Sequence, residues 1–265
     1  MVRILFGLVI WLSCAVGMAQ LPTDLVTGPQ RSKPEKEGKQ KVFVSAGPEI
    51  SLTLPTVFGS DNQTVRSDTL FSVDPAFRYR FGFALRLDFS AIFALQTGLY
   101  YISRRHDVGV GRTNGSNQQF DSVYYREGIN YIGYEIPVMA LVYARLGEKT
   151  FLNNSVGFSF DFYPSSAVRV VPEEEFRLFV GRNSWVVPAL KASVGFEYRS
   201  DDQGYFYVGG NFHQPIVPLA DMFIERNGPT GPIGFQTQRI PMSGTYFSVD
   251  VKYFFPPGKK NKWIR

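Results

Sequence analysis

This 265-residue sequence contains two histidines, His106 and His213, whose side chains could serve acid–base catalysis. His213 is predicted to share an inward-facing surface with Asp161 and Asp250, and such a group could form part of a hydrolytic site. No spacing fixes a serine or cysteine nucleophile beside His213, and His106, in a predicted loop, has the same deficiency. We therefore predict that both histidines are held by polar neighbours and that the protein is not an enzyme.

The sequence indicates neither a metal site nor a cofactor site. No His, Cys and carboxylate spacing matches that of a metal centre. The glycines are scattered along the predicted strands and are not grouped as in a phosphate-binding loop. We therefore predict no cofactor.

The strongest pattern is a strict alternation between residues 76 and 90, which is typical of a β-strand with two different faces. One face carries Phe77, Tyr79, Phe81, Phe83, Leu85, Leu87 and Phe89. The other face carries Arg78, Arg80, Gly82, Ala84, Arg86 and Asp88. In a soluble protein the charged face meets water, whereas in a membrane barrel the apolar face meets lipid and the charged face lines the interior.

Similar alternation predicts eight strands, separated alternately by short and long connections. The predicted strands are residues 42–54, 75–89, 93–105, 131–146, 151–163, 185–199, 205–214 and 244–255. This rhythm indicates an all-β, eight-stranded, antiparallel, up-and-down transmembrane β-barrel with short periplasmic turns and long extracellular loops. A soluble barrel of the lipocalin kind is the alternative, but aromatic residues recur opposite the charges in nearly every strand.

The two faces of the predicted barrel give two sets of candidate residues. The predicted charge network of the lumen comprises Arg78, Arg80, Arg86, Asp88, Arg104, Glu135, Arg145, Asp161, Lys191, Glu197, Asp250 and Lys252. The predicted lipid-facing set comprises Phe77, Tyr79, Phe81, Phe83, Leu85, Phe158, Phe160, Phe196, Phe247, Tyr253 and Phe255. Because eight strands leave only enough room for side chains, we expect a lumen filled by ion pairs.

The segments outside the barrel have a different composition. Residues 1–19 have the charge, apolar run and small-residue cleavage site of a signal peptide, and Cys14 lies inside it. A lipobox is the less favoured reading of Cys14, because Trp11 stands where such a motif has Leu or Val. Residues 20–40 are predicted to be a flexible periplasmic lead-in, residues 41–255 the outer-membrane barrel, and residues 256–265 a basic periplasmic tail. Since the basic excess belongs to these short ends of an exported chain, we do not expect a nucleic-acid partner.

Several short motifs carry a family resemblance over residues 41–255. They are residues 95–101 followed by Arg104 and Arg105, residues 134–137, residues 207–213, and residues 253–255. This set resembles the Bacteroidetes-type, PorT-like family of small outer-membrane β-barrel proteins. The resemblance implies an eight-stranded outer-membrane barrel, and for some family members an association with type IX secretion. The sequence departs from the usual barrel ending, because Pro256, Pro257 and a basic tail follow the last aromatic residue.

Three functions are compatible with the sequence. The favoured one is a non-enzymatic envelope protein with a filled lumen, which binds an envelope protein partner through its loops or periplasmic ends. The alternatives are an anion-preferring channel for small solutes and an outer-membrane hydrolase. The remaining expected partners are outer-membrane lipid, lipopolysaccharide and the barrel assembly machinery.

Overall fold

The computed structural model describes residues 42–54, 63–66, 70–113, 120–164, 166–171, 176–200, 202–226 and 236–256. These residues form fourteen β-strands, and every pairing between strands is antiparallel. The strands are β1 (Phe43–Leu54), β2 (Gln63–Arg66), β3 (Leu70–Pro75), β4 (Arg78–Asp88), β5 (Phe93–Thr113), β6 (Phe120–Arg145), β7 (Thr150–Phe162), β8 (Ala167–Val171), β9 (Phe176–Arg182), β10 (Val186–Ser200), β11 (Gly204–Pro215), β12 (Ala220–Arg226), β13 (Gln236–Met242) and β14 (Tyr246–Phe254). The prediction of an all-β, antiparallel fold is confirmed. The described part of the chain contains no helix that could cross a membrane.

Eight of these strands pair in a cyclic order, which we call the ring. The order is β5-β4-β1-β14-β11-β10-β7-β6, and β6 also pairs with β5, so each of the eight has two hydrogen-bonded neighbours within the ring. The first and last strands of the ring meet directly, with Ile50 of β1 opposite Val251 of β14. These eight strands overlap the eight predicted segments, but β5 and β6 extend beyond the predicted 93–105 and 131–146. The prediction of His106 in a loop is therefore wrong, because this residue lies in β5.

Three tight connections of the ring lie at one end of the molecule, which we call the short-turn end. They follow β4, β6 and β10, and backbone hydrogen bonds tie them to their neighbours. The amide of Tyr143 donates to the carbonyl of Ile92, and the amide of Arg199 donates to the carbonyl of Lys149. Serine caps the first turn, since Ser90 Oγ accepts hydrogen bonds from the amides of Ile92 and Phe93.

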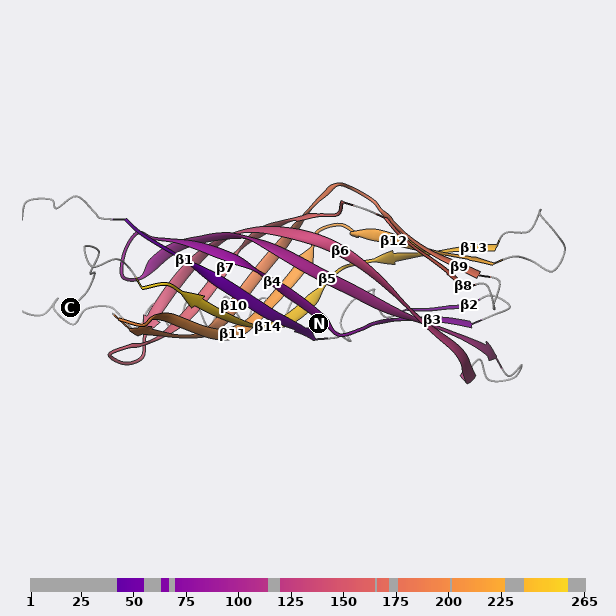
Figure 1. The fold of residues 1–265 in the computed structure, drawn as a ribbon, viewed down its shortest axis with the longest axis horizontal. Helices are drawn as coiled ribbons and strands as arrows, with labels where there is room; N and C mark the ends of the chain where they lie inside the picture. The colour runs from indigo at the N-terminus through magenta and orange to yellow at the C-terminus, as the bar shows by residue number, and fades with distance from the viewer. Residues whose placement is uncertain are drawn as a thin grey trace, which may run out of the picture.

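The expectation of eight strands and four long loops is wrong at the opposite end, because these connections contain strands as well. Strands β2 and β3 extend the sheet beside the far ends of β5 and β6. Strands β8, β9, β12 and β13 form a separate four-stranded sheet, which we call the cap sheet. Figure 1 shows an elongated molecule in which β5 and β6 run from the ring into this extension, with the cap sheet beside them.

The extension has an apolar core of its own, which we call the upper core. Val73, Val108 and Ile129 contribute from β3, β5 and β6, and the cap sheet contributes Leu178 and Met222 among others. The edges of the two sheets also lie near each other, with β6 beside β8 and β2 beside β13. Burial of these side chains is the physical reason why the connections fold, since short strands gain little stability alone.

Burial alternates along every strand of the ring. In β1 the pattern is strictly alternating, with Glu49 buried and Ile50 54% exposed. The same alternation in β4 buries Arg78, Arg80 and Arg86 and exposes the aromatic residues between them. The ring therefore has a polar inner face and an apolar outer face, which is the reverse of a soluble barrel.

Three predicted segments lie outside the described residues: the signal peptide (1–19), the lead-in (20–40) and nearly all of the basic tail (256–265). Pro256 is the part of that tail which the structure describes, and it is exposed.

Candidate functional site

Arg80 lies at the centre of the largest cluster of charged side chains inside the ring. Its guanidinium forms ion pairs with Glu49, Glu135 and Asp250, and its contacts with Glu135 and Asp250 are both 3.3 Å long. It also lies over the Tyr100 ring, 4.2 Å from the centroid, as a cation–π contact. The Arg80 side chain is 1% exposed, so its charge is neutralised almost wholly by protein groups.

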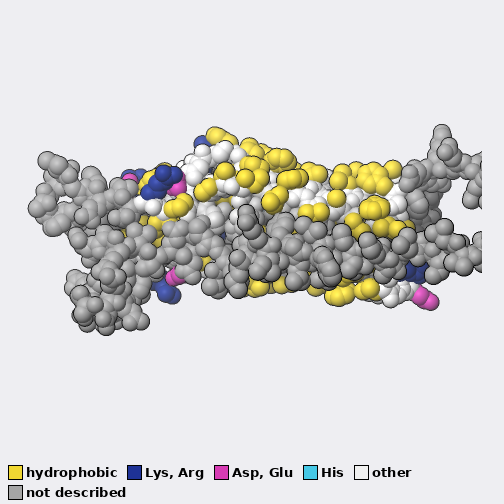
Figure 2. All heavy atoms as spheres, turned by 180° about the vertical axis from the view of Figure 1, so that it is seen from behind, with side chains coloured by type: hydrophobic (Ala, Val, Ile, Leu, Met, Phe, Trp, Pro, Cys, Tyr) yellow, Lys and Arg dark blue, Asp and Glu magenta, His cyan; other side chains and the backbone are white. Residues whose placement is uncertain are grey.

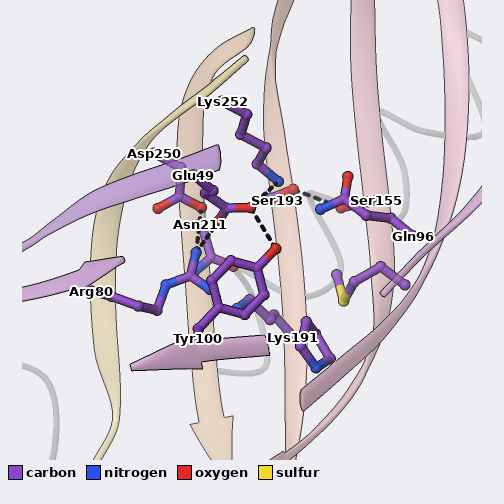
Figure 3. A pocket seen from close by; sticks show the side chains of 12 residues that line it. Glu49, Arg80, Gln96, Tyr100, Ser155, Lys191, Ser193, Asn211, Asp250 and Lys252 are labelled. Carbon is purple, nitrogen blue, oxygen red and sulfur yellow. Dashed lines mark hydrogen bonds and ion pairs between the residues drawn. The ribbon is translucent and has the colours of Figure 1, made fainter. Parts of the chain in front are cut away.

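The carboxylates of this central cluster have further partners. Glu49 accepts a hydrogen bond of 2.7 Å from the Tyr100 hydroxyl and lies 3.5 Å from Lys252 Nζ. Glu135 pairs with Lys191 and accepts a 2.7 Å hydrogen bond from the Tyr246 hydroxyl. These groups converge from different strands around one point, as Figure 3 shows for Glu49, Arg80, Tyr100 and Lys252. The arrangement satisfies buried charges that would otherwise be costly.

The space left at the centre of this cluster is small. Side chains from all eight strands of the ring surround it, so it lies across the axis of the ring. Its lining comprises Glu49, Arg80, Gln96, Tyr100, Pro137, Met139, Ser155, Lys191, Ser193, Asn211, Asp250 and Lys252. The cavity measures about 10 Å³ for the centre of a water molecule, which is room for about one water.

A second cluster lies nearer the short-turn end and combines charge with aromatic rings. Glu197 forms ion pairs with Arg86 at 2.9 Å and with Arg199 at 2.6 Å. It also accepts a hydrogen bond of 3.1 Å from the side-chain amide of Asn153. The guanidinium of Arg86 is 4.4 Å from the Phe254 ring centroid, and Arg199 is also stacked on aromatic rings. This cluster occupies the interior of the ring between the central cluster and the short-turn end.

A third cluster lies toward the upper core. Arg104 pairs with Asp161 at 3.4 Å and donates a hydrogen bond of 3.0 Å to the carbonyl of Gly244. His213 stacks on Tyr246 with a centroid distance of 4.5 Å and is fully buried. The three clusters and the upper core lie inside the described part of the molecule, and each is held by contacts between different strands.

The geometry around His213 is unsuitable for a hydrolytic triad. Its Nε2 atom lies 3.1 Å from Ser159 Oγ and 3.2 Å from Asp161 Oδ1. A triad needs the acid on one ring nitrogen and the nucleophile on the other, whereas here both contact the same nitrogen. All three side chains are also fully buried among the described residues.

The same region contains a group of side chains that could be considered for a metal ion. Ligand atoms of Glu135, Asp161 and His213 lie within 4.8 Å of one another. However, Glu135 already pairs with Arg80 and Lys191, and Asp161 pairs with Arg104. A divalent cation would have to displace or face these fixed positive charges, so the residues do not fit a metal centre.

The structure brings most of the predicted lumen residues together. Those of the set that are buried are Arg78, Arg80, Arg86, Arg104, Glu135, Asp161, Lys191, Glu197, Asp250 and Lys252. Asp88 is partly buried and pairs with Arg86 at 3.3 Å. The prediction that Arg145 lies in the lumen is wrong, because this residue is exposed at the end of β6 and donates a hydrogen bond to the carbonyl of Gly147.

The interior also contains residues that the sequence analysis did not select. Glu49 carries a charge in the central cluster and Arg199 carries one in the second cluster. Tyr100, Tyr207 and Tyr246 are buried in the interior as well. The signal for Glu49 was present, since it alternates with the apolar Ile50, Leu52 and Leu54. The tyrosines could not be assigned in this way, because tyrosine is common on both faces of such strands.

The predicted lipid-facing residues lie on the outer face of the ring. Phe77, Tyr79, Phe81, Phe83, Leu85, Phe158, Phe160, Phe196 and Phe255 are exposed, and Phe247 and Tyr253 are partly exposed. In Figure 2 the visible side chains along the middle are mainly hydrophobic, and charged side chains appear at the two ends. Isolated exposed apolar residues are common, but a continuous apolar surface of this kind requires an apolar environment.

The outer surface of the cap sheet differs from that of the ring. It carries exposed arginines in ion pairs, including Arg169 with Glu127 at 2.8 Å and Arg239 with Asp221 at 2.6 Å. The Asp221 carboxylate, through its hydrogen bond and its charge, raises the pKa of the Arg239 guanidinium. In both pairs the arginine side chain is more than half exposed, which is typical of a surface in water, although Asp221 itself is buried.

Comparison with known proteins gives one solved structure to report. The crystal structure of the outer membrane protein OprG from Pseudomonas aeruginosa is 12% identical, with a TM-score of 0.48 over 80% of this chain and 95% of that chain. No family model matches the sequence, and no curated protein matches it.

Proposed function

We propose that the chain forms a closed, eight-stranded β-barrel that spans the outer membrane. The support is the cyclic pairing of eight strands together with an apolar outer face and a charged inner face. Every strand of the ring has at least nine residues, enough to cross the hydrocarbon region at a tilt. A closed barrel satisfies all backbone groups between strands, which lipid requires. Export through the leader at residues 1–19 and delivery by the barrel assembly machinery belong to the same proposal.

We propose further that this barrel is not a conduit and not an enzyme, and that it acts as an envelope protein through its two ends. The observation that carries this proposal is the filled interior. At the centre, Arg80 pairs with Glu135 and Asp250, each two strands away around the ring, and the cavity leaves room for about one water. Nearer the short-turn end, Arg86 on β4 and Glu197 on β10 pair from opposite sides of the ring. Above them, the upper core closes the interior with packed apolar side chains. The exposed ends are then the surfaces available to lipopolysaccharide and to an envelope protein partner.

Planar-bilayer recording tests the sealed interior directly. The purified protein should insert without steady single-channel steps above the leak of the bilayer. Steady steps would contradict the proposal and favour the anion-preferring channel, because three cations and two carboxylates line the central cavity. A matched sample with Arg80→Gln and Glu49→Gln removes charges without adding bulk, and it should begin to conduct if the ion pairs form the seal.

The partner can be sought by cross-linking in intact cells followed by mass spectrometry. Adducts to a second envelope protein would support the proposed role, and adducts to the chain itself alone would count against it. The PorT-like resemblance makes secretion components the first candidates to look for. That assignment rests on the short motifs of the sequence.

A further inference from the structure

Trp185 lies in the short connection between the cap sheet and the ring. This connection runs from Arg182, the last residue of β9, to Val186, the first residue of β10. The Trp185 side chain is 62% exposed, and its backbone carbonyl accepts a hydrogen bond of 3.3 Å from the amide of Tyr163. The backbone is therefore fixed at the boundary between the two sheets, while most of the indole surface stays accessible.

The guanidinium of Arg182 is held against this indole ring. It lies 3.9 Å from the centroid of the Trp185 ring, as a cation–π contact. Its Nη1 atom donates hydrogen bonds to the carbonyl of Pro164 at 2.7 Å and to the carbonyl of Tyr163 at 3.2 Å. Both bonds use Nη1, and among the described residues nothing accepts a hydrogen bond from Nε or Nη2. The guanidinium is thus oriented by the protein and still has one edge to offer.

Arg182 also differs from three other arginines of the cap sheet in its charge balance. Arg169, Arg177 and Arg239 each lie within 4 Å of a carboxylate. In the part of the chain that the structure describes, no carboxylate lies that close to the guanidinium of Arg182. The Nε and Nη2 edge of an arginine binds a phosphate group through two parallel hydrogen bonds. The geometry and the charge therefore both suit a phosphate.

The surface beside Trp185 is apolar and continues the outer face of the ring. Val186, Ile216 and Val217 are all exposed there. The amide of Ile216 donates a hydrogen bond of 3.0 Å to the carbonyl of Pro188, so this segment lies against the start of β10. A tryptophan and an arginine at the edge of an apolar surface are typical of the boundary between lipid and water.

We propose that Arg182 and Trp185 bind a lipopolysaccharide molecule, with the Nε and Nη2 groups on a phosphate of its lipid A and the indole against its acyl chains. This inference rests on the proposed function, because it needs the ring to span the outer membrane with its short turns in the periplasm. The cap sheet lies at the opposite end (Figure 1), so this boundary is in the outer leaflet, which lipopolysaccharide forms. A free phosphate ion and an acidic protein are the competing occupants.

The test measures the binding of lipid A to the full chain in detergent micelles, with Trp185 as the reporter. The sequence has three tryptophans, so Trp11→Phe and Trp263→Phe leave Trp185 as the sole one. The two probes are lipid A with its phosphate groups and the same lipid after their removal. Because both probes carry identical acyl chains, the difference in their affinity reports the phosphate contact alone.

We expect lipid A to change the Trp185 fluorescence and to bind about tenfold more tightly than the dephosphorylated lipid, because only lipid A can accept the charge-assisted hydrogen bonds. Arg182→Gln should lower the affinity for lipid A by a similar factor. Arg182→Lys keeps the charge without the two-donor edge, so it should recover only part of the affinity. Arg177→Gln on the same strand is the matched control and should have no effect, because Arg177 is paired with Glu225 at 3.7 Å.

Two kinds of failure have different meanings. If the protein shows no heat-dependent shift on gels, it forms no barrel, and the proposed function itself is wrong. If it folds but binds the two lipids alike, or if Arg182→Gln binds lipid A as tightly as Arg177→Gln, the lipopolysaccharide inference is overturned. The comparison of the two lipids needs no change at Arg182, so it decides the question even if Arg182→Gln does not fold.

Two further results would assign the site to a different occupant and would also overturn the inference. Displacement of lipid A by an equal concentration of inorganic phosphate would identify a site for the free ion. A Trp185 response that appears only with a cell-envelope protein fraction, and not with lipid A, would identify a site for an acidic protein.

Discussion

Replacing Arg80 with Met tests whether the interior ion pairs hold the barrel together. Arg80 contacts three carboxylates, but its loss does not leave all three without a cation. Glu49 keeps Lys252, and Glu135 keeps Lys191. Among the described residues, Arg80 is the cation within 4 Å of Asp250. The change therefore leaves one uncompensated buried charge, for which we expect a cost of about 3–5 kcal/mol in the free energy of unfolding.

The assay is urea unfolding of the purified protein in detergent. Unfolding is monitored by tryptophan fluorescence and by the heat-dependent migration of the protein on gels. Arg145→Met is the matched control, because this arginine is exposed at the end of its strand and should cost less than about 0.5 kcal/mol. Adding Asp250→Asn to Arg80→Met should restore part of the stability, since it removes the orphaned charge. The reasoning is refuted if Arg80→Met costs no more than Arg145→Met, or if Asp250→Asn lowers stability further by its full separate effect.

Two other predictions concern packing. A Cβ atom at Gly209 would lie 2.2 Å from the Tyr207 hydroxyl oxygen, so Gly209→Val should destabilise the barrel by about 1–3 kcal/mol in the same urea assay. At the neighbouring Gly210 a Cβ atom meets nothing within 4 Å, so Gly210→Val should leave the stability nearly unchanged. Equal effects of the two substitutions would contradict this prediction. Met222→Ala removes a fully buried side chain from the upper core, and it should lower the stability of that core by about 2–5 kcal/mol. The cap sheet should then become sensitive to protease, while the ring keeps its heat-dependent migration on gels. The exposed Val170→Ala should leave protease resistance unchanged, and a protease-resistant Met222→Ala protein would argue against a separate upper core.

The alternating pattern was sufficient to predict the ring strands, because each has two contrasting faces over at least nine residues. It predicted Arg80 and Glu135 on the inner face and Phe196 on the outer face, where the structure places them. It could not give the pairing partners of these charges, since those depend on which strands are neighbours and on their register. Arg145 was misplaced because alternation continues to the last residue of a strand, where the interior has already ended.

The cap sheet was missed because its strands are short. Leu178 and Val180, like Met222 and Ile224, alternate with other residues over only two or three repeats. Runs of this length between Pro, Gly and charged residues do not differ from loop sequence. What makes them strands is the upper core, and that contact joins segments far apart in the chain.

The central claim is that the outer face of the ring lies in lipid. The most direct measurement of this claim compares the stability of Val156→Arg with that of Val170→Arg. Both valines are 58% exposed, but Val156 is on β7 within the ring and Val170 is on β8 of the cap sheet. In lipid vesicles we predict that Val156→Arg lowers the free energy of unfolding by about 2–4 kcal/mol, because an arginine there must enter the hydrocarbon. Val170→Arg should change it by less than about 0.5 kcal/mol. Equal, small effects of the two substitutions would contradict a membrane-spanning barrel.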